Sequence, residues 1–149
     1  MDNIFVRIMT KEDIEQVVII EEEAFSSPWS VKGFEESLEL KYSRFYVVVI
    51  DEEVAGYVGT YFMGDEVDIT NIAVSKKYRR RGLADSLIEA VLSYSKEVEA
   101  TAINLEVRPS NSPARSLYKK YGFEELGIRK NFYTKPVEDG IIMRKDLSA

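Results

Sequence analysis

The chain gathers three arginines directly before a glycine, where the apolar spacing predicts that a helix begins. Arg79, Arg80 and Arg81 precede Gly82. The first N–H groups of a helix have no partner inside the helix, and the helix dipole makes this end positive. Gly82 lets the backbone approach a ligand closely, and the guanidinium groups add forked donors. The segment therefore suits a pyrophosphate, although a solvated basic helix start fits the same pattern.

Two other side chains could move protons. Glu106 lies in the segment AINLEV, where apolar residues alternate with Ala102, Asn104 and Glu106. Its carboxylate could accept a proton, but the pattern alone favours a glutamate that faces solvent or pairs with Arg108. Tyr118 carries a phenol with an ordinary pKa of about 10, which could donate a proton. Its place on an apolar helical stripe fits a buried structural tyrosine equally well.

The composition narrows the chemistry further. The 149 residues include no cysteine and no histidine, which argues against thiolate nucleophiles, Ser-His-Asp hydrolysis and His-Cys zinc sites. We expect no metal. The net charge of −6, from 20 basic and 26 acidic side chains, disfavours a nucleic-acid partner and favours a basic peptide or an amine. Without a membrane-length apolar run or a signal-peptide pattern, we expect no membrane partner and a cytoplasmic location.

The elements that position these residues follow from periodicity, caps and turns, and they predict one domain over residues 1–149. Helices are expected from Thr10 to about Phe25, from Ser30 to about Leu40, from Gly82 to about Ser95, and from a cap at Ser112 to Gly122. Strands are expected at residues 3–9, 43–50, 54–63, 66–74 (after a turn at Gly64 and Asp65), 101–107, 123–133 and 140–147.

This order predicts a mixed α+β sheet. The strands at 43–50, 54–63 and 66–74 form an antiparallel meander, and the last two form a hairpin. The strand at 101–107 follows a helix, so it should return beside ITNIAV, residues 69–74, in a parallel right-handed crossover. The arginine loop then lies at this crossover.

The segment RRRGLA resembles the acetyl-CoA pyrophosphate loop of the Gcn5-related N-acetyltransferases (GNAT), whose pattern is Gln/Arg-x-x-Gly-x-Gly/Ala. Arg79, Gly82 and Ala84 are the matching positions. The segment NIAV resembles the strand of that family whose backbone pairs with the pantetheine arm. The order of elements matches the family over essentially the whole chain. The resemblance implies a mostly antiparallel seven-stranded sheet with flanking helices and one central parallel pair, and acetyl-CoA as co-substrate.

Within the superfamily, the chain most resembles the RimI-type ribosomal-protein-alanine N-acetyltransferases. The segments that carry this likeness are PWS, NIAV, LEVRPSN, LYKKYGF, RKNFY and EDGIIM, taken in their joint order. The resemblance implies that Glu106 accepts a proton from the acceptor amine, directly or through water. It also implies that Tyr118 donates a proton to coenzyme A.

The resemblance implies further site residues. The cofactor-binding set is Ile72, Ala73 and Val74 through their backbone, then Arg79, Arg80, Arg81, Gly82, Leu83, Ala84, Asn111 and Tyr118. Asn111 could instead simply cap the loop. Trp29 and Tyr133 could line the acceptor groove, although Trp29 equally fits a plug in the core. Asp65, Glu66, Asp68 and Glu138 could attract a basic peptide or be solvated.

The resemblance thus favours acetylation of an N-terminal alanine of a ribosomal protein, by direct transfer through a ternary complex. A lysine side chain or a small amine, such as a polyamine or an antibiotic, is an alternative acceptor. A non-catalytic module that senses acyl-CoA is an alternative of another class. A deep closed acceptor pocket would favour the small amine, and an open groove would favour a peptide.

Overall fold

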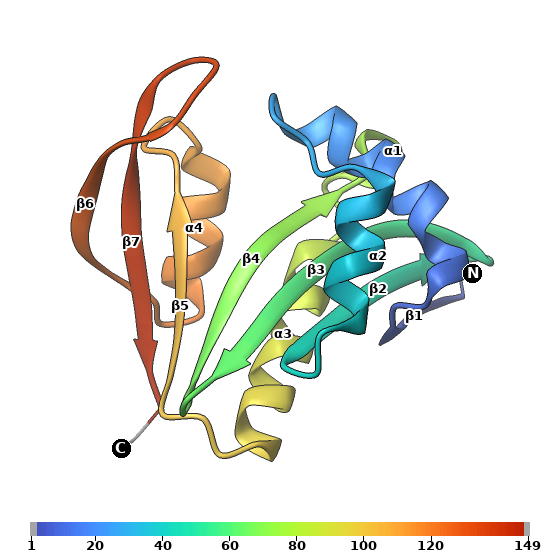
Figure 1. Ribbon diagram of the computed structural model, residues 1–149, viewed down its shortest axis with the longest axis horizontal. Coiled ribbons are helices and arrows are strands. Elements are labelled where there is room, and N and C mark those ends of the chain that lie inside the picture. Colours follow the sequence, from blue (N-terminus) through green and yellow to red (C-terminus); the bar gives the residue numbers. More distant parts are fainter. Residues whose placement is uncertain (1–2, 148–149) are drawn as a thin grey trace.

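A computed structural model describes residues 3–147 (Figure 1). Its elements follow the predicted order of strands and helices, with short 3-10 turns at Lys11–Asp13 and Lys76–Tyr78. They are β1 (Ile4–Ile8), α1 (Ile14–Ala24), α2 (Val31–Glu39), β2 (Ser43–Ile50), β3 (Glu53–Met63), β4 (Glu66–Val74), α3 (Leu83–Glu97), β5 (Ala102–Val107), α4 (Ser112–Lys120), β6 (Glu124–Tyr133) and β7 (Glu138–Asp146).

The strands form one seven-stranded sheet in the order β1-β2-β3-β4-β5-β7-β6. Neighbours pair antiparallel except β4 and β5, which pair parallel. This confirms the mixed, mostly antiparallel sheet with a central parallel pair. The strand β7 enters between β5 and β6, so it lies next to the strand that carries Glu106.

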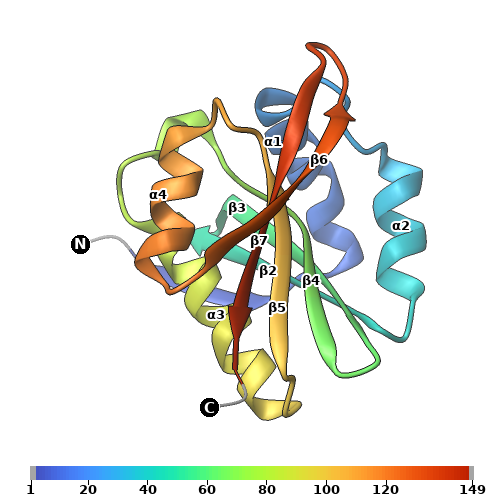
Figure 2. The ribbon, with the colours of Figure 1, turned by 90° about the vertical axis from the view of Figure 1, so that its left-hand side faces the viewer.

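Helices cover both faces of the sheet, with α1 and α2 on one side and α3 and α4 on the other (Figure 2). Each side has its own buried cluster. The cluster under α3 and α4 includes Leu87, Ile103 and Met143, and the cluster under α1 and α2 includes Phe34 and Tyr57. In each cluster, apolar residues at helical spacing on the helices pack against alternate residues of the strands.

The parallel pair is short, and the strands then diverge (Figure 1). Only Glu66–Asp68 of β4 pairs with Ala102–Asn104 of β5. The expected pairing of residues 69–74 with β5 is therefore wrong. The cause lies on the other edge of β4, where Thr70 is an extra residue between the positions that pair with Gly59 and Thr60 of β3. A bulge of this kind bends and twists its strand, which here carries β4 away from β5.

Two helices, α2 and α4, start at a side-chain cap, and the cap of α4 lies one residue earlier than expected. Ser30 caps α2 as predicted, accepting a hydrogen bond from the Gly33 N–H at 3.1 Å. The cap of α4 is Asn111, whose Oδ1 accepts from the Ala114 N–H at 3.2 Å, so the prediction of Ser112 was wrong. Ala114 is the third residue of α4, so its N–H has no partner inside the helix, and the Asn111 side chain accepts from it.

Candidate active site

Glu106 stands on β5, beside the place where β4 turns away. The predicted alternation is confirmed, because Leu105 and Val107 join the core under α3 and α4 while Glu106 lies on the other face. The Glu106 side chain is 22% exposed. Within residues 3–147 its Oε2 atom is buried without a hydrogen-bond partner, and Oε1 lies 3.4 Å from Arg129 Nη1.

The surroundings of Glu106 make it a better proton acceptor than an exposed glutamate. Burial raises the pKa of Glu106, the positive charge of Arg129 opposes the rise, and the negative charge of Asp68 adds to it. The expected alternative partner, Arg108, instead donates to Glu138 and to the carbonyls of Thr134 and Pro136. A carboxylate with a raised pKa and an unpaired oxygen can accept a proton from a neighbouring ammonium group.

Tyr118 is buried on α4 with 4% of its surface exposed, and its ring packs 5.8 Å from the ring of Phe123. Burial raises the pKa of the Tyr118 phenol above its ordinary value, and Tyr133 adds to the rise. The phenol is therefore protonated at neutral pH, which is the state that a proton donor needs. Tyr118 also belongs to the core cluster, as its place on the apolar stripe predicts. Its ring can pack in the core while its hydroxyl group donates a proton.

Tyr133, at the end of β6, is close enough to link these two groups electrostatically. Burial raises the pKa of Tyr133 to about 12, with a further contribution from the Glu106 charge. The guanidinium of Arg108 lies 4.5 Å from the centre of the Tyr133 ring. The structure thus brings Glu106, Tyr118 and Tyr133 into one region, and their roles as base, acid and acceptor-lining residue stay predictions.

Trp29 belongs to the aromatic core beneath α2. Its ring lies 5.3 Å from that of Phe34 and 6.3 Å from that of Phe45. The cluster under α1 and α2 includes it as a half-buried member. These contacts correspond to the expectation of a core plug, one of the two roles that the sequence left open.

The arginine loop has the conformation that an anion site requires. Gly82 is the N-cap of α3 in the left-handed region, with a φ of 74°, and no atom lies within 4 Å of the position that a Cβ would take. The open space above Gly82 and the N-terminus of the 15-residue helix α3 fit a phosphate group. Leu83 is buried, so it could serve such a ligand only through its backbone.

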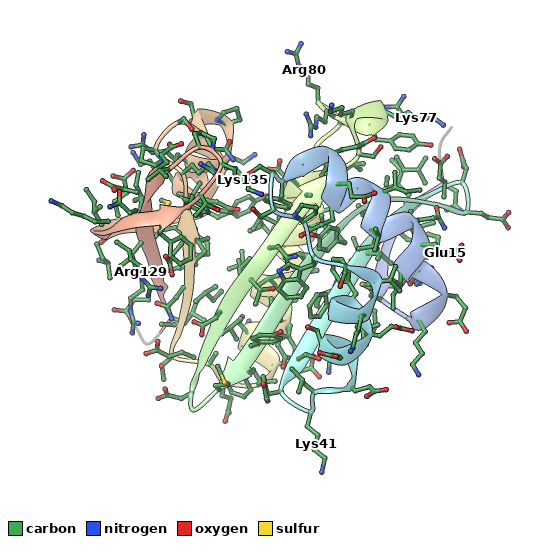
Figure 3. All side chains as sticks on the ribbon, turned by 45° about the horizontal axis from the view of Figure 1, so that its top comes forward. Glu15, Lys41, Lys77, Arg80, Arg129 and Lys135 are labelled. Carbon is green, nitrogen blue, oxygen red and sulfur yellow. The ribbon has the colours of Figure 1, made fainter. Side chains whose placement is uncertain are left out.

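The three arginines are placed differently. Arg79 Nε lies 3.4 Å from the Val74 carbonyl oxygen, and the Arg81 guanidinium lies 5.6 Å from the centre of the Tyr78 ring. Arg80 has a positive φ of 67° and points away from the body of the molecule (Figure 3). The guanidinium of Arg80 therefore extends into solvent, where it could meet an anion.

The strand before this loop also has an edge for the cofactor. Ile72, Ala73 and Val74 pair with β3 on one side, and on the other side β5 has already diverged. The edge of β4 toward β5 can therefore hydrogen-bond an extended ligand. Asn111 uses its side-chain oxygen for the cap of α4, which leaves its amide N–H groups for any ligand role.

Replacing Arg80 and Arg81 together by alanine should weaken acetyl-CoA binding about ten- to a hundredfold at low salt, because charge-assisted contacts to phosphate are lost. Calorimetric titration with acetyl-CoA at low and high salt measures this, and the difference between variant and wild type should shrink as salt screens the charges. Lys96→Ala, in the last turn of α3, is the control for a removed positive charge. Unchanged affinity in the double variant would leave the loop as a solvated basic helix start.

Sequence reasoning missed a buried carboxylate near the place where β4 diverges from β5. Glu21 of α1 is 2% exposed, and its Oε2 accepts from the Trp29 N–H at 2.9 Å. Its Oε1 accepts from the Tyr57 hydroxyl and from Asn71 Nδ2, the latter at 3.3 Å. Burial raises the pKa of Glu21, while the hydrogen bonds from Trp29 and Asn71 oppose the rise.

The signal for Glu21 was present in the sequence. It lies seven residues after Ile14 and four after Val17, on the apolar stripe of α1, where a charged residue must be paired. Its network joins the segment before α2 to Asn71, which follows the bulge of β4. Glu21 therefore helps to fix the position of β4 where this strand diverges from β5.

The acidic residues proposed to attract a basic peptide are partly engaged. Glu66 forms an ion pair with Arg144 at 2.9 Å, and Asp68 accepts from Asn104 Nδ2 at 3.2 Å. Glu138 accepts from the Ser110 N–H at 2.8 Å and pairs with Arg108. Residues 3–147 contain no cluster of acidic groups arranged to hold a metal ion, and none of their helices is long and apolar enough to cross a membrane.

Two hollows of the surface lie away from these groups. One of about 260 Å³ is lined by residues of β1, α2 and β2, and one of about 420 Å³ by residues around α4 and β6. Glu106 and Tyr118 line neither. The candidate site is therefore defined by the divergence of β4 and β5 and by its titratable groups.

Known proteins resemble this chain over nearly its whole length. The model of the Acetyltransferase (GNAT) family matches residues 14–123. A protein of Bacillus subtilis (strain 168), named provisionally as a ribosomal protein bS18-alanine N-acetyltransferase, is 44% identical over 139 residues, 93% of this chain and 92% of that protein. The ribosomal protein bS18-alanine N-acetyltransferase of Escherichia coli (strain K12) is 35% identical over 138 residues, 91% of this chain and 93% of that protein.

Solved structures show the same fold. The crystal structure of the ribosomal-protein-S18-alanine N-acetyltransferase from Escherichia coli has a TM-score of 0.90 and 31% identity, covering 100% of this chain and 96% of that chain. The structure of Ard1 from Thermoplasma volcanium has a TM-score of 0.89 and 25% identity, covering 96% of this chain and 97% of that chain.

Proposed function

The chain belongs to the acetyltransferase (GNAT) family and is an N-acetyltransferase, and we propose that it acetylates the α-amino group of an N-terminal alanine of a ribosomal protein. The observation that carries this proposal is the likeness to relatives named for that reaction, over 91–93% of this chain and 92–93% of theirs. We take residues 1–149 as one N-acetyltransferase domain. A cytoplasmic location is part of the proposal, because ribosomal proteins are made there.

Acetyl-CoA is the proposed acetyl donor, lying between β4 and β5. The N-terminus of α3, with Gly82 and Arg80, would hold its pyrophosphate, and the backbone of Ile72–Val74 would bind its pantetheine arm. The open space above Gly82 and the free edge of β4 support this placement.

The proton transfers follow from the placement of two side chains. Glu106, directly or through a water, would take a proton from the acceptor ammonium, whose ordinary pKa of about 8 requires only modest help. The amine nitrogen would then bond to the carbonyl carbon of the thioester, while a backbone N–H of β4 could stabilise the developing negative charge on oxygen. As the carbon–sulfur bond breaks, Tyr118 would give its proton to the leaving thiolate, and the second proton lost by the amide nitrogen would restore the phenol of Tyr118 through solvent. Transfer is direct within a ternary complex.

Release of the coenzyme A thiol tests the proposal. The enzyme is given acetyl-CoA and a basic peptide that begins with alanine, beside the same peptide with a blocked N-terminus. Because the chain has no cysteine, a thiol reagent reports only coenzyme A. Release with the free N-terminus alone is the expected result. Equal release with both peptides would assign the activity to lysine side chains, and release with neither would point to a small amine.

A further inference from the structure

We propose that Arg129 is the resting counter-ion of Glu106 and gives up this position to the ammonium group of the acceptor. The inference rests on the proposed function, because it takes the acceptor to be an amine that arrives protonated. Arg129 comes from the outer strand β6, whereas Glu106 lies on β5, with β7 between them. An arginine must therefore reach across one strand to form this contact.

An irregularity of β6 follows directly after Arg129. The pairing of β6 with β7 shifts between Arg129, which pairs with Gly140, and Tyr133, which pairs with Glu138. Within this stretch Asn131 has a positive φ of 53°, and its N–H donates to Asp139 Oδ1 at 2.9 Å. Such bulges redirect side chains, often beside active sites.

The strand between Arg129 and Glu106, β7, carries a glycine, Gly140, beside both residues. A Cβ on Gly140 would lie 3.1 Å from Phe132 and 3.2 Å from Glu106 Oε2. The missing side chain thus lets Phe132 and Glu106 approach each other over β7. The Arg129 guanidinium lies 5.0 Å from the centre of the Phe132 ring, and its Nη1 lies 3.4 Å from Glu106 Oε1.

The ion pair between Arg129 and Glu106 is exposed and long, so little energy is needed to break it. The Arg129 side chain is 58% exposed, and its distance to Glu106 exceeds that of a short charged hydrogen bond. An ammonium group carries the same charge, is smaller, and can donate hydrogen bonds to the carboxylate. The guanidinium can move aside into solvent, so a protonated acceptor could take its place at low cost.

The charges around Glu106 indicate how the return of Arg129 would restore the ionised carboxylate after each reaction. Asp68 of β4 and Tyr133 of β6 face it, Arg129 is its ion-pair partner among residues 3–147, and the opposite residue on β7 is the apolar Ile142. After the acceptor proton has moved to Glu106 and the neutral amide has left, the return of Arg129 favours the ionised carboxylate. The proton then passes to solvent, and the base is restored.

The test uses Arg129→Gln, with Arg129→Lys to keep the charge. Lys130→Gln is the matched control, since Lys130 is the next residue of β6 and is also exposed. Carbon-13 NMR of labelled glutamate carboxyls gives the pKa of Glu106 without an acceptor or turnover. Binding of the alanine peptide, with a free or an acetylated N-terminus, is measured in the presence of coenzyme A, so that no reaction occurs.

Arg129→Gln should raise the pKa of Glu106 and tighten binding of the free peptide about two- to fivefold, the scale of an exposed ion pair. Lys130→Gln and Arg129→Lys should resemble the wild type, and the acetylated peptide should bind all variants alike. An unchanged pKa of Glu106, or weaker binding of the free peptide, would overturn the inference. If the wild type binds neither peptide, the proposed acceptor is wrong, and the titration alone decides whether Arg129 is the counter-ion.

Discussion

Replacement of Glu106 by glutamine is expected to lower kcat about 10²- to 10⁴-fold at neutral pH, while the Kd for acetyl-CoA stays the same. Glutamine keeps the shape of the side chain but cannot accept the proton of the acceptor ammonium. The loss should shrink above about pH 8, because a growing share of α-amino groups is then already neutral. Steady-state rates across pH, with calorimetry of acetyl-CoA binding, measure both parts of this prediction.

The control for this variant is Glu15→Gln, the same chemical change at an exposed position of α1 (Figure 3). It should leave the rate and its pH dependence unchanged. Loss of acetyl-CoA binding in Glu106→Gln would instead assign Glu106 to the structure of the cofactor groove. A rate defect of equal size at every pH would argue against a role as proton acceptor.

Replacement of Tyr118 by phenylalanine should lower kcat about 10²-fold, because the leaving thiolate loses its proton donor. The ring and its packing against Phe123 are retained, so the melting temperature should change little. Since burial raises the pKa of Tyr118, the wild type should show no loss of activity from this group up to about pH 10, the ordinary pKa of a phenol.

A matched control is Tyr94→Phe, which removes the hydroxyl of another buried tyrosine, on α3. Single-turnover rates and thermal unfolding are measured for both variants. If Tyr118→Phe keeps the wild-type rate, or if Tyr94→Phe loses as much, Tyr118 is a core residue and coenzyme A takes its proton from elsewhere.

Local patterns were sufficient for most of the fold. Alternating apolar residues located each strand, and caps and helix breakers located each helix, because these signals come from neighbouring residues. The cap at Asn111 was missed because Asn111 and Ser112 are both good caps, and Pro113 directly after Ser112 suits the first position of a helix capped by Ser112.

The divergence of β4 from β5 could not be derived from local patterns. It depends on the bulge at Thr70. A Cβ on Gly59 would clash with the Phe45 ring and would lie 2.8 Å from Thr70 Oγ1, so a glycine at this position leaves room for both side chains. Glu21 supports the same region through Asn71, fifty residues later in the chain. Such long-range contacts leave weak traces in a single sequence.

The candidate site, like the fold, depends partly on long-range contacts that local patterns do not predict. The roles of Glu106 and Tyr118 came from the family resemblance, because their residue patterns alone favour a solvent-facing glutamate and a core tyrosine. The structure adds the partner of Glu106. Pairing with Arg108 was one of the alternatives for Glu106, but the ion-pair partner among the described residues is Arg129 of β6.

The most direct test of the central claim is fragmentation mass spectrometry of the product. The substrate is a basic peptide that begins with alanine and contains internal lysines, incubated with the enzyme and acetyl-CoA. We predict one acetyl group, located on the α-amino nitrogen of the alanine. An acetyl group on a lysine side chain with the N-terminus left free would contradict the proposed function.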